Sequence, residues 1–476
     1  MGDYRYLFPF EKIPLGSRVL IYGAGVLGQE YLKQMMITGY CEVIGFADRN
    51  HASYPPMVVP VYAPEEIHGL AFDYVVVALR GGFGVPEVKR LLSEQKVRDE
   101  QVVCILERAP SPPVAISAVP ARFCYVPAFE ADRMSVALYL AGGIGDMICQ
   151  KRFVMELLSL MPQAGIDIYA AQNVDFLRWL YSDREQVRNV LLDAGVEYGR
   201  VCTDYVLAIS IFGSQFLRVE HFAASQAEME APVCSERIKE LAQQAEADSL
   251  SPASPNALST LRHICNEQDC YSWFNYNNVF FIKDRRVTIP PLPEKRTFFQ
   301  TMGDIAYITV HSGNGSSKTG KGIAKTWPME YFQKTILLFK KLYPSIAVVQ
   351  VGAAEEAKLG GADSFLMGRE FETVASVLQR AIFHLDIEGG LVHLASQLGT
   401  KCIVLFGPTQ MEYYSYPQNI NIHVDNCHPC AGLYPSVDYC ARHMEKPKCM
   451  YGITPELVME KITEYMQKRC SQRQED

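Results

Sequence analysis

Long apolar runs are missing from this sequence: none approaches the roughly 18 residues that a membrane-spanning helix needs. The first residues, MGDYRYLFPFEK, contain neither the basic region nor the apolar region of a signal peptide. Positive charge is also scarce, because 45 Lys and Arg stand against 53 Asp and Glu and give a formal net charge of −8. A nucleic-acid binder needs a basic surface to neutralise phosphates, so this class is excluded. We therefore expect a cytoplasmic protein, without a transmembrane segment, that is free or lies at the inner surface of the membrane.

The chain of 476 residues is long enough for about three domains of ~150 residues each. Short apolar runs alternate with amphipathic stretches in three regions, 18–106, 135–210 and 305–409. This rhythm is typical of parallel sheets covered by helices, so the predicted fold class is α/β. The segment 109–121 contains four prolines and predicts a linker. The predicted parts are a Rossmann-like, nucleotide-binding-type domain at 1–110, a first lobe at 122–300, a second lobe at 301–450 and a terminal helix at 451–476.

The first glycine motif, Gly23-x-Gly25-x-x-Gly28, follows a predicted strand at 18–22 and opens a predicted helix. Asp48 lies twenty residues after Gly28, at the end of the next apolar run. Glycines at this spacing let a diphosphate approach the helix N-terminus, and the acid could hold a ribose hydroxyl. The alternative is a Rossmann-like fold kept only for packing or assembly. The motif favours neither interpretation, and no Tyr-x-x-x-Lys pair of a dehydrogenase follows it.

A second glycine loop, Gly142-Gly143-Ile-Gly145-Asp146, joins the predicted strand 135–141 to a predicted helix. Such a loop brings a substrate close to the backbone and presents Asp146 at its tip. A carboxylate in this place could deprotonate a hydroxyl nucleophile. Aspartate is also a favoured N-cap, and on the motif alone the capping role is the simpler interpretation.

Two segments of the last third could bind an anion. The loop HSGNGSSKTGKGIAKTWP at 311–328 contains glycines, hydroxyls and three lysines, among them Lys325. It lacks the Gly-Lys-Ser/Thr ending of a phosphate-hydrolysing loop, and a solvated lysine loop is the alternative. The segment Glu388-Gly389-Gly390 should lie between a strand and a helix, whose N-terminus can stabilise a diphosphate. His393 in this helix is most simply a structural histidine.

Ten of the fourteen cysteines are scattered along the chain and are typical of reduced, mostly buried thiols. The other four are crowded near the C-terminus and begin with a C-x-x-C pair. Four thiolates of this kind can hold tetrahedral zinc or iron, so we expect one structural metal ion. These candidate ligands are Cys427, Cys430, Cys440 and Cys449, with His423, His428 and His443 as nearby alternatives.

Together, three segments resemble the heptosyltransferase family of glycosyltransferases, family 9: GGIGDMI at 142–148, HSGNGSSKTGKGIAKTWPMEYF at 311–332 and EGGLVHLASQLGTKCIVLFGPTQ at 388–410. The resemblance covers roughly 135–465. It implies a GT-B architecture, in which two Rossmann-like lobes face one cleft and the second lobe binds most of the donor. The implied activity is inverting transfer of a sugar, such as heptose from ADP-heptose, to an acceptor hydroxyl in a bacterial cytoplasm.

The same resemblance implies roles for individual residues. Asp146 would be the general base, on an acceptor-side loop formed by Gly142, Gly143 and Gly145. The donor would contact Ser312, Gly313, Lys325, Glu388, Gly389, Gly390 and His393. We expect no catalytic metal, because lysines and a helix N-terminus can take the place of a cation. The family usually has Asp-Ser/Thr-Gly where this chain has Glu388-Gly389-Gly390, a difference that bears on the donor sugar.

Two further resemblances concern the cysteine-rich segment and the first domain. The architecture resembles autotransporter protein heptosyltransferases, whose cysteine-rich segment binds iron. The segments GAGVLGQEYL, VIGFADRN, VPVYAPEEI and DYVVVAL resemble the N-terminal domain of PglD-type sugar acyltransferases, so a nucleotide in the first domain is left open. The acceptor is a glycan, a lipopolysaccharide or a protein, and a homo-oligomer is compatible with the sequence. The rival functions are an NAD-linked sugar-nucleotide oxidoreductase or epimerase and a non-catalytic GT-B assembly protein.

Overall fold

A computed structural model describes residues 7–79, 84–104, 134–214, 216–230, 232–248, 255–275, 279, 282, 284–292, 305–313, 324–431, 440 and 442–475. Contacts between residues divide the chain into two compact units. The first unit consists of 1–112, 250–268 and 428–435. The second unit consists of 113–249, 269–427 and 436–476.

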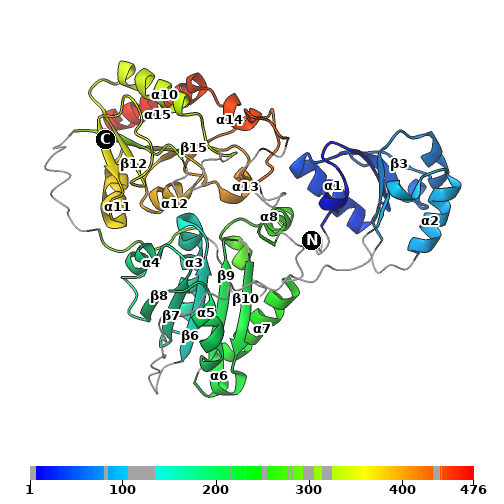
Figure 1. The fold of residues 1–476 in the computed structure, drawn as a ribbon, viewed down its shortest axis with the longest axis horizontal. Coiled ribbons are helices and arrows are strands. Elements are labelled where there is room, and N and C mark those ends of the chain that lie inside the picture. Colours follow the sequence, from blue (N-terminus) through cyan, green and yellow to red (C-terminus); the bar gives the residue numbers. More distant parts are fainter. Residues whose placement is uncertain are drawn as a thin grey trace. The chain divides into compact units, whose positions relative to one another are not determined.

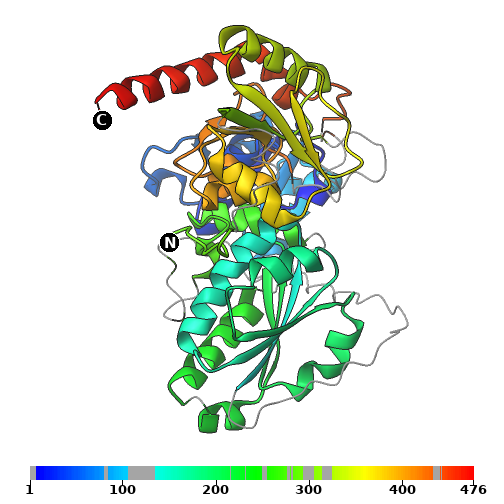
Figure 2. The same cartoon turned by 90° about the vertical axis from the view of Figure 1, so that its left-hand side faces the viewer.

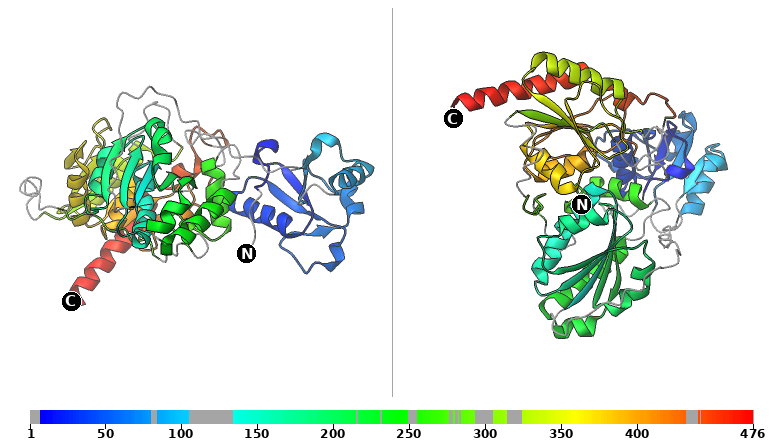
Figure 3. Two further views of the ribbon diagram at one scale, coloured as in Figure 1. Left: turned by 90° about the horizontal axis from the view of Figure 1, so that it is seen from below. Right: turned by 60° about the vertical axis from the view of Figure 1, so that its left-hand side comes forward.

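The first unit contains a five-stranded parallel sheet with the strand order β3-β2-β1-β4-β5. Helices α1 and α2 pack into separate core clusters, and Figures 1 and 3 show them on opposite faces of this sheet. The elements are β1 (Arg18–Tyr22), α1 (Val26–Thr38), β2 (Glu42–Ala47), β3 (Val61–Tyr62), β4 (Tyr74–Val77), α2 (Val85–Glu94) and β5 (Val102–Cys104), with short 3₁₀ helices at Phe10–Lys12, His51–Ser53, Pro64–Gly69 and Asp99–Gln101. The predicted Rossmann-like α/β order is confirmed.

Helix α8 (Pro255–Cys265) also belongs to the first unit, although the sequence places its residues within the first lobe, 122–300. Leu261 and Cys265 are buried in the core cluster that contains α1. The Lys33 side chain donates a hydrogen bond of 2.8 Å to the Cys265 carbonyl and so satisfies one of the last carbonyls of α8. A helix from a distant stretch of the chain therefore completes the core of the first unit.

The second unit begins with a lobe built on the sheet β10-β9-β6-β7-β8, in which only β10 is antiparallel to its neighbour among the described strands. Figure 2 shows these strands side by side with α3 running along them. We call this the first lobe. Its elements are β6 (Ser135–Ala141), α3 (Ile144–Leu160), β7 (Gly165–Ala170), α4 (Val174–Leu180), β8 (Val187–Leu192), α5 (Val196–Val201), β9 (Leu207–Phe212), β10 (Phe216–Phe222), α6 (Ala224–Glu230) and α7 (Pro232–Asp248), with 3₁₀ helices at Cys202–Asp204 and Ser272–Phe274.

The second lobe of this unit has six parallel strands in the order β13-β12-β11-β14-β15-β16. The chain order reverses between β11 and β14, as in doubly wound folds, so the predicted pair of Rossmann-like lobes is confirmed. The elements are β11 (Tyr307–Val310), α10 (Met329–Leu342), β12 (Ala347–Gly352), β13 (Ser364–Met367), α11 (Phe371–Arg380), β14 (His384–Ile387), α12 (Gly390–Gln397), β15 (Cys402–Leu405), α13 (Met411–Tyr414), β16 (Ile420–Ile422), α14 (Lys448–Gly452) and α15 (Pro455–Glu475).

The terminal helix α15 is part of the second lobe. Val458 and Ile462 are buried in the same core cluster as Phe332 and Phe339 of α10, and Figure 1 shows the two helices side by side. The Trp327 indole, at the start of α10, donates a hydrogen bond of 2.8 Å to the Ile453 carbonyl just before α15. Within the described ranges, the structure contains no helix that is long and apolar enough to cross a membrane.

Candidate active site

The predicted base, Asp146, lies in the first turn of α3. The Gly143 N–H donates a hydrogen bond of 2.8 Å to one Asp146 carboxylate oxygen. Gly143 is the N-cap of α3, and Asp146 is the third helical residue, whose side chain reaches back to the cap as in a capping box, so the expectation that Asp146 is the N-cap itself is wrong. Burial raises the pKa of Asp146, whereas the Gly143 N–H, the Ser214 hydroxyl and His393 lower it. The cap and the chemical role are compatible, because an oxygen that accepts one N–H retains a further lone pair.

Backbone packing fixes the loop around Asp146. Gly142 has φ of +143°, and a Cβ atom there would lie 2.6 Å from the Asp146 Cβ, so glycine is required. The Gln150 amide of α3 donates to the carbonyls of Ala141 (2.9 Å) and Gly213 (2.8 Å). These bonds hold the β9–β10 turn against the end of β6. Ser214, which sequence reasoning missed, is thereby buried beside the Asp146 loop.

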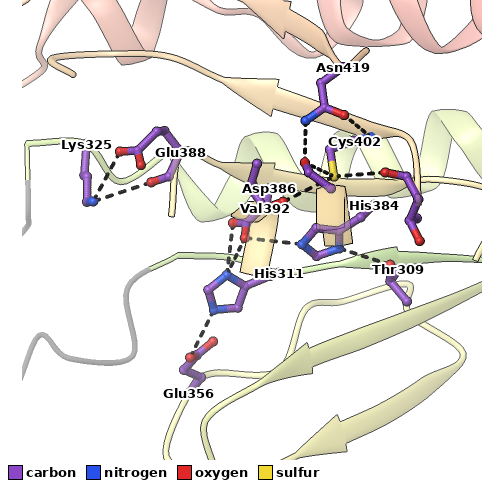
Figure 4. A network of polar contacts seen from close by, with 12 residues as sticks. Thr309, His311, Lys325, Glu356, His384, Asp386, Glu388, Val392, Cys402 and Asn419 are labelled. Carbon is purple, nitrogen blue, oxygen red and sulfur yellow. Dashed lines mark hydrogen bonds and ion pairs between the residues drawn. The ribbon is translucent and has the colours of Figure 1, made fainter. Parts of the chain in front are cut away.

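The predicted donor turn lies between β14 and α12. The Lys325 Nζ is 3.6 Å from a Glu388 carboxylate oxygen and 3.4 Å from the Glu388 carbonyl, as Figure 4 shows. Burial alone would raise the pKa of Glu388, but Lys325 and His393 lower it to about 2. Gly389 caps α12, and the helix begins at Gly390 with its N–H groups directed at this turn. The arrangement places a cation and a helix N-terminus together.

His393 joins the two lobes. Its Nε2 lies 3.7 Å from a Glu388 oxygen, and its Nδ1 is 2.8 Å from the Tyr416 hydroxyl. Burial would lower the pKa of His393, but Cys149 of α3 and Glu388 raise it. In turn, Cys270 and His393 lower the pKa of the buried Cys149 thiol against the effect of burial. Sequence reasoning gave Cys149 no role beyond a buried thiol, because nothing in the sequence brings α3 and α12 together.

The N-terminal ends of α3 and α12 touch each other. A Cβ atom on Gly145 would lie 2.6 Å from the His393 ring, and one on Gly390 would lie 2.9 Å from the Ile144 Cβ. Because both contacts are shorter than real Cβ contacts, both glycines are needed for this close approach. The approach puts the Asp146 carboxylate near enough to Glu388 for that charge to raise the pKa of Asp146. The residues predicted for the acceptor side and those predicted for the donor side thus lie close together.

A histidine and two carboxylates lie at the point where the strand order of the second lobe reverses. His311 follows β11, Asp386 is in β14 and Glu356 follows β12. The His311 Nδ1 is 2.9 Å from an Asp386 oxygen, and its Nε2 is 3.3 Å from a Glu356 oxygen (Figure 4). The sequence analysis assigned no role to Asp386 or Glu356. Only His311 directly follows its strand, whereas Asp386 lies within β14 and Glu356 comes four residues after β12, so no common local pattern marks the three residues.

The other predicted donor residues are only partly described. Ser312 is buried, and Gly313 has φ of +140°, which favours glycine. The lysine loop beyond them, including Lys318 and Lys321, lies outside the described residues.

The N-terminal motif has the predicted strand–loop–helix placement. A Cβ atom on Gly28 would lie 1.9 Å from the Gly23 carbonyl oxygen, so close packing of α1 requires this glycine. Asp48 accepts hydrogen bonds from the Ala24 N–H (2.8 Å), the Asn50 N–H (2.8 Å) and the Tyr54 hydroxyl (3.2 Å). Its carboxylate therefore holds the glycine loop itself. Packing and ribose binding both stay predictions for this motif, because a carboxylate oxygen that accepts a hydrogen bond retains a further lone pair.

The four predicted metal ligands are divided between the two units: Cys430 belongs to the first, and Cys427, Cys440 and Cys449 belong to the second. Cys440 and Cys449 are buried, whereas Cys427 and Cys430 are partly exposed. Cys449 is buried in the apolar core of the second lobe, next to Met450. In the part of the chain that the structure describes, no group of three or more His, Cys, Asp or Glu side chains is placed to hold a metal ion. The predicted metal is therefore not confirmed.

Comparison with known proteins finds a family match within the second lobe. Residues 314–432 match the family model described as glycosyltransferase family 9 (heptosyltransferase). This stretch, about a quarter of the chain, is similar to that family. The lipooligosaccharide heptosyltransferase 2 of Campylobacter jejuni is 27% identical over 156 residues, which are 30% of this chain and 47% of that protein. The chain therefore spans about half the length of this curated relative.

Solved structures with similar folds include two from Escherichia coli. The ADP-heptose lipopolysaccharide heptosyltransferase II is 14% identical, with a TM-score of 0.45 over 71% of this chain and 99% of that one. The iron-containing dodecameric glycosyltransferase TibC is also 14% identical, with a TM-score of 0.43 over 71% of this chain and 77% of that one. The family 9 match confirms the resemblance on which the donor-side prediction rests. The likeness of 1–110 to acyltransferases stays a prediction.

Proposed function

We propose that this chain is an inverting glycosyltransferase that moves a sugar from a nucleoside-diphosphate donor, of the ADP-heptose type, to an acceptor hydroxyl. The observation that carries the proposal is the contact between the N-terminal ends of α3 and α12. It brings the Asp146 carboxylate to the same site as Lys325 and the Glu388–Gly389 turn. A base and an anion-binding turn on facing lobes are the two parts that this transfer needs.

In the proposed reaction, the acceptor oxygen attacks the anomeric carbon while Asp146 takes its proton. The bond between that carbon and the diphosphate oxygen breaks, and the nucleoside diphosphate leaves with the electron pair. Lys325 and the backbone N–H groups at the start of α12 meet the charge on the leaving group. Because the nucleophile and the leaving group lie on opposite sides of the carbon, the configuration inverts. The Lys325–Glu388 distance of 3.6 Å is long for an ion pair, so Lys325 can turn to the diphosphate.

The donor nucleoside is proposed to lie where the strand order reverses, between β11 and β14. Ligands of doubly wound sheets bind in this crevice at the carboxyl ends of the strands, and an acid after the second strand holds the ribose. Glu356 follows β12, the second strand of this lobe, and its Oε2 is buried without a hydrogen-bond partner in the described part of the chain. A ribose hydroxyl would satisfy this oxygen.

The acceptor and the setting of the reaction are also proposals. A lipooligosaccharide-type acceptor fits the activity printed for the Campylobacter jejuni relative, and a protein hydroxyl or another glycan is the alternative. We place the reaction in the cytoplasm. A homo-oligomer is included in the proposal, since TibC is described as dodecameric.

A structural iron or zinc at Cys427, Cys430, Cys440 and Cys449 remains a proposal from the spacing alone. It is supported by the leading C-x-x-C pair, whereas no metal-binding group is found among the described residues. Elemental analysis of protein purified under reducing conditions tests it. About one equivalent of iron or zinc supports the site, and less than about a tenth of an equivalent removes it, because a closed thiolate site retains its metal.

The rival functions have less support. An oxidoreductase or epimerase run by the first unit would need catalytic residues beyond the glycine loop, and no Tyr-x-x-x-Lys pair of a dehydrogenase follows that loop. A non-catalytic assembly protein would have no need for a buried carboxylate and a lysine at the contact of two helix N-termini.

The test combines a panel of nucleotide sugars with the Asp146→Asn variant. Wild-type protein should transfer from one donor class, read by mass spectrometry of the product. Asp146→Asn keeps the size and much of the capping ability, so it should fold and bind the donor while kcat falls by at least ~10²-fold. Turnover near the wild-type rate in folded Asp146→Asn protein would remove the base from the mechanism.

A further inference from the structure

The carboxyl ends of β12, β11 and β14 hold a compact group of ionisable side chains. Glu356, His311 and Asp386 come from these three neighbouring strands, with His384 behind them (Figure 4). All four side chains are nearly or fully buried. Ionisable groups that are buried together often mark a binding or catalytic site, so this group is a candidate ligand site.

The contacts fix the protonation state of His311. Its Nδ1 lies 2.9 and 3.0 Å from the two Asp386 oxygens, and its Nε2 lies 3.3 Å from a Glu356 oxygen. An ionised carboxylate only accepts hydrogen bonds, so both ring nitrogens must donate, and the ring is an imidazolium. Burial would lower the pKa of His311, but Asp386 and Glu356 raise it to about 10, which agrees with this assignment.

His384 contacts the far side of Asp386. Its Nε2 lies 3.3 Å from an Asp386 oxygen, and its Nδ1 lies 3.0 Å from the Thr309 hydroxyl. Two carboxylates, Asp386 and Glu356, therefore share the His311 imidazolium.

The Glu356 carboxylate is held by one oxygen only. Its Oε1 accepts hydrogen bonds from His311 and from the Ala353 N–H, at 2.9 Å. A Cβ atom on Gly352 would lie 2.4 Å from Oε2, so the glycine leaves room for this oxygen. Oε2 is buried and has no partner among the described residues. A buried acceptor without a partner costs roughly 1–3 kcal/mol, which a bound hydroxyl would remove.

The charge of the group selects the ligand. A phosphate would meet two carboxylates and, among the residues that the structure describes in this group, no free donor, so it is disfavoured here. A hydroxyl brings the hydrogen that Oε2 lacks. Within the proposed donor, the ribose is the portion that offers hydroxyls next to a diphosphate.

We infer that His311 is a positioning residue, whose imidazolium holds the Glu356 carboxylate so that its free oxygen can accept a ribose hydroxyl of the donor. This inference rests on the proposed function and adds the residue that orients the ribose acceptor. Without the imidazolium, Glu356 and Asp386 would be two buried carboxylates that repel each other, and Glu356 would take up a proton or turn away.

The experiment measures binding of ADP and of 2′,3′-dideoxy-ADP to the full chain by titration calorimetry. Wild-type protein should bind ADP about tenfold or more tightly than the dideoxy compound, as expected for one hydrogen bond to a charged group. His311→Gln should bind ADP about tenfold more weakly and should no longer distinguish the two nucleotides. Glu356→Gln should lose the distinction in the same way. This variant tests the inference if His311→Gln fails to fold. His384→Gln is the matched control, because His384 shares Asp386 but does not touch Glu356, and it should keep the distinction.

The outcomes separate this inference from the proposed function. Equal binding of both nucleotides by wild-type protein that transfers sugar would overturn the inference and leave the function standing. A folded His311→Gln protein that still prefers ADP tenfold would reduce His311 to a structural role. Absence of binding to ADP, UDP and GDP together with absence of transfer would overturn the proposed function itself.

Discussion

Asp146 meets two requirements that usually conflict. In the capping box of α3 it must accept the Gly143 N–H, and as the proposed base it must stay accessible to the acceptor. The structure resolves this because the Gly143 N–H binds one oxygen only. Burial and Glu388 raise the pKa of Asp146, and Gly143, Ser214 and His393 oppose that shift. The strength of the base is thus set by several neighbours, each of which can be tested.

Ser214 should control the pH dependence of the reaction. Its hydroxyl lowers the pKa of Asp146, so Ser214→Ala should raise that pKa. The acid limb of the profile of kcat against pH, where Asp146 gains a proton, should therefore move to higher pH. On this acid limb we expect kcat to fall by about two- to tenfold, because a larger share of Asp146 would be protonated at a given pH. Ser210→Ala is the control, since Ser210 on β9 is equally buried but contacts Tyr198. An unshifted acid limb in Ser214→Ala would show that Ser214 does not act on the base.

Lys325 should act mainly on departure of the leaving group. Lys325→Met removes the cation at the donor turn, and a donor to developing charge is worth ~10²–10³ in kcat. It should also raise the pKa of Glu388, because Lys325 is among the groups that lower it. Steady-state kinetics with the identified donor provide the measurement. Lys334→Met, which removes a surface ion pair with Glu456 on the same lobe, should leave kcat unchanged. Equal kinetics for the two variants would argue against a role of Lys325 at the phosphates.

Sequence reasoning found the residues of the site that belong to contiguous motifs. Asp146, Lys325 and the Glu388–Gly390 turn each sit in a glycine-rich loop that the sequence displays directly. The contacts of His311 with Asp386 and Glu356 could not be found this way. They join residues 75 and 45 positions apart, and they exist because β11 lies between β14 and β12.

At the scale of elements, the buried inner strands were predictable and several edge strands were not. The run SVALYLA matches β6 residue for residue, and RVLIY matches β1. By contrast, β8, β13 and β16 lie at or next to sheet edges, carry mixed burial and gave no apolar run. The antiparallel β10 departs from the parallel pattern that the helix–strand rhythm predicts. Pairing with a neighbour, which no local pattern encodes, defines these strands.

The contact between α3 and α12 makes a prediction about Gly145. Alanine is the better helix former, so Gly145→Ala should not weaken α3 through helix propensity. Its Cβ atom would lie 2.6 Å from the His393 ring and must push the two helix ends apart. A misplacement of this size can reduce kcat by about 10²-fold, and we expect at least a tenfold loss with an unchanged Tm. Gly69→Ala, which meets nothing within 4 Å, is the control. Full activity in Gly145→Ala would mean that the reaction does not need this contact.

At the scale of the whole molecule, the two units are interleaved in sequence. The first unit takes α8 from the stretch after α7, so its core needs residues 250–268 as well as 1–112. A chain that starts near Ala121 would lack 1–112 but would keep α8. Such a deletion would uncover the face of α8 that carries Leu261 and Cys265. Loss of solubility on deletion would then result from the uncovered apolar face of α8. It would not show that the first unit takes part in catalysis.

A substitution in the full chain avoids that ambiguity. Leu261 is fully buried against the core of α1, so Leu261→Ala should destabilise the first unit by roughly 2–5 kcal/mol. Because the site lies in the second unit, kcat and the donor KM at a temperature below unfolding should stay within about twofold of wild type, a change of less than 0.5 kcal/mol. Calorimetry and limited proteolysis followed by mass spectrometry would show whether the first-unit sheet and α8 unfold together. Leu192→Ala, at a leucine that is 73% exposed, is the matched control and should change neither stability nor rate. If Leu261→Ala keeps the wild-type unfolding profile, α8 does not belong to the core of the first unit. If it unfolds that unit and abolishes transfer at once, the first unit supports the site directly.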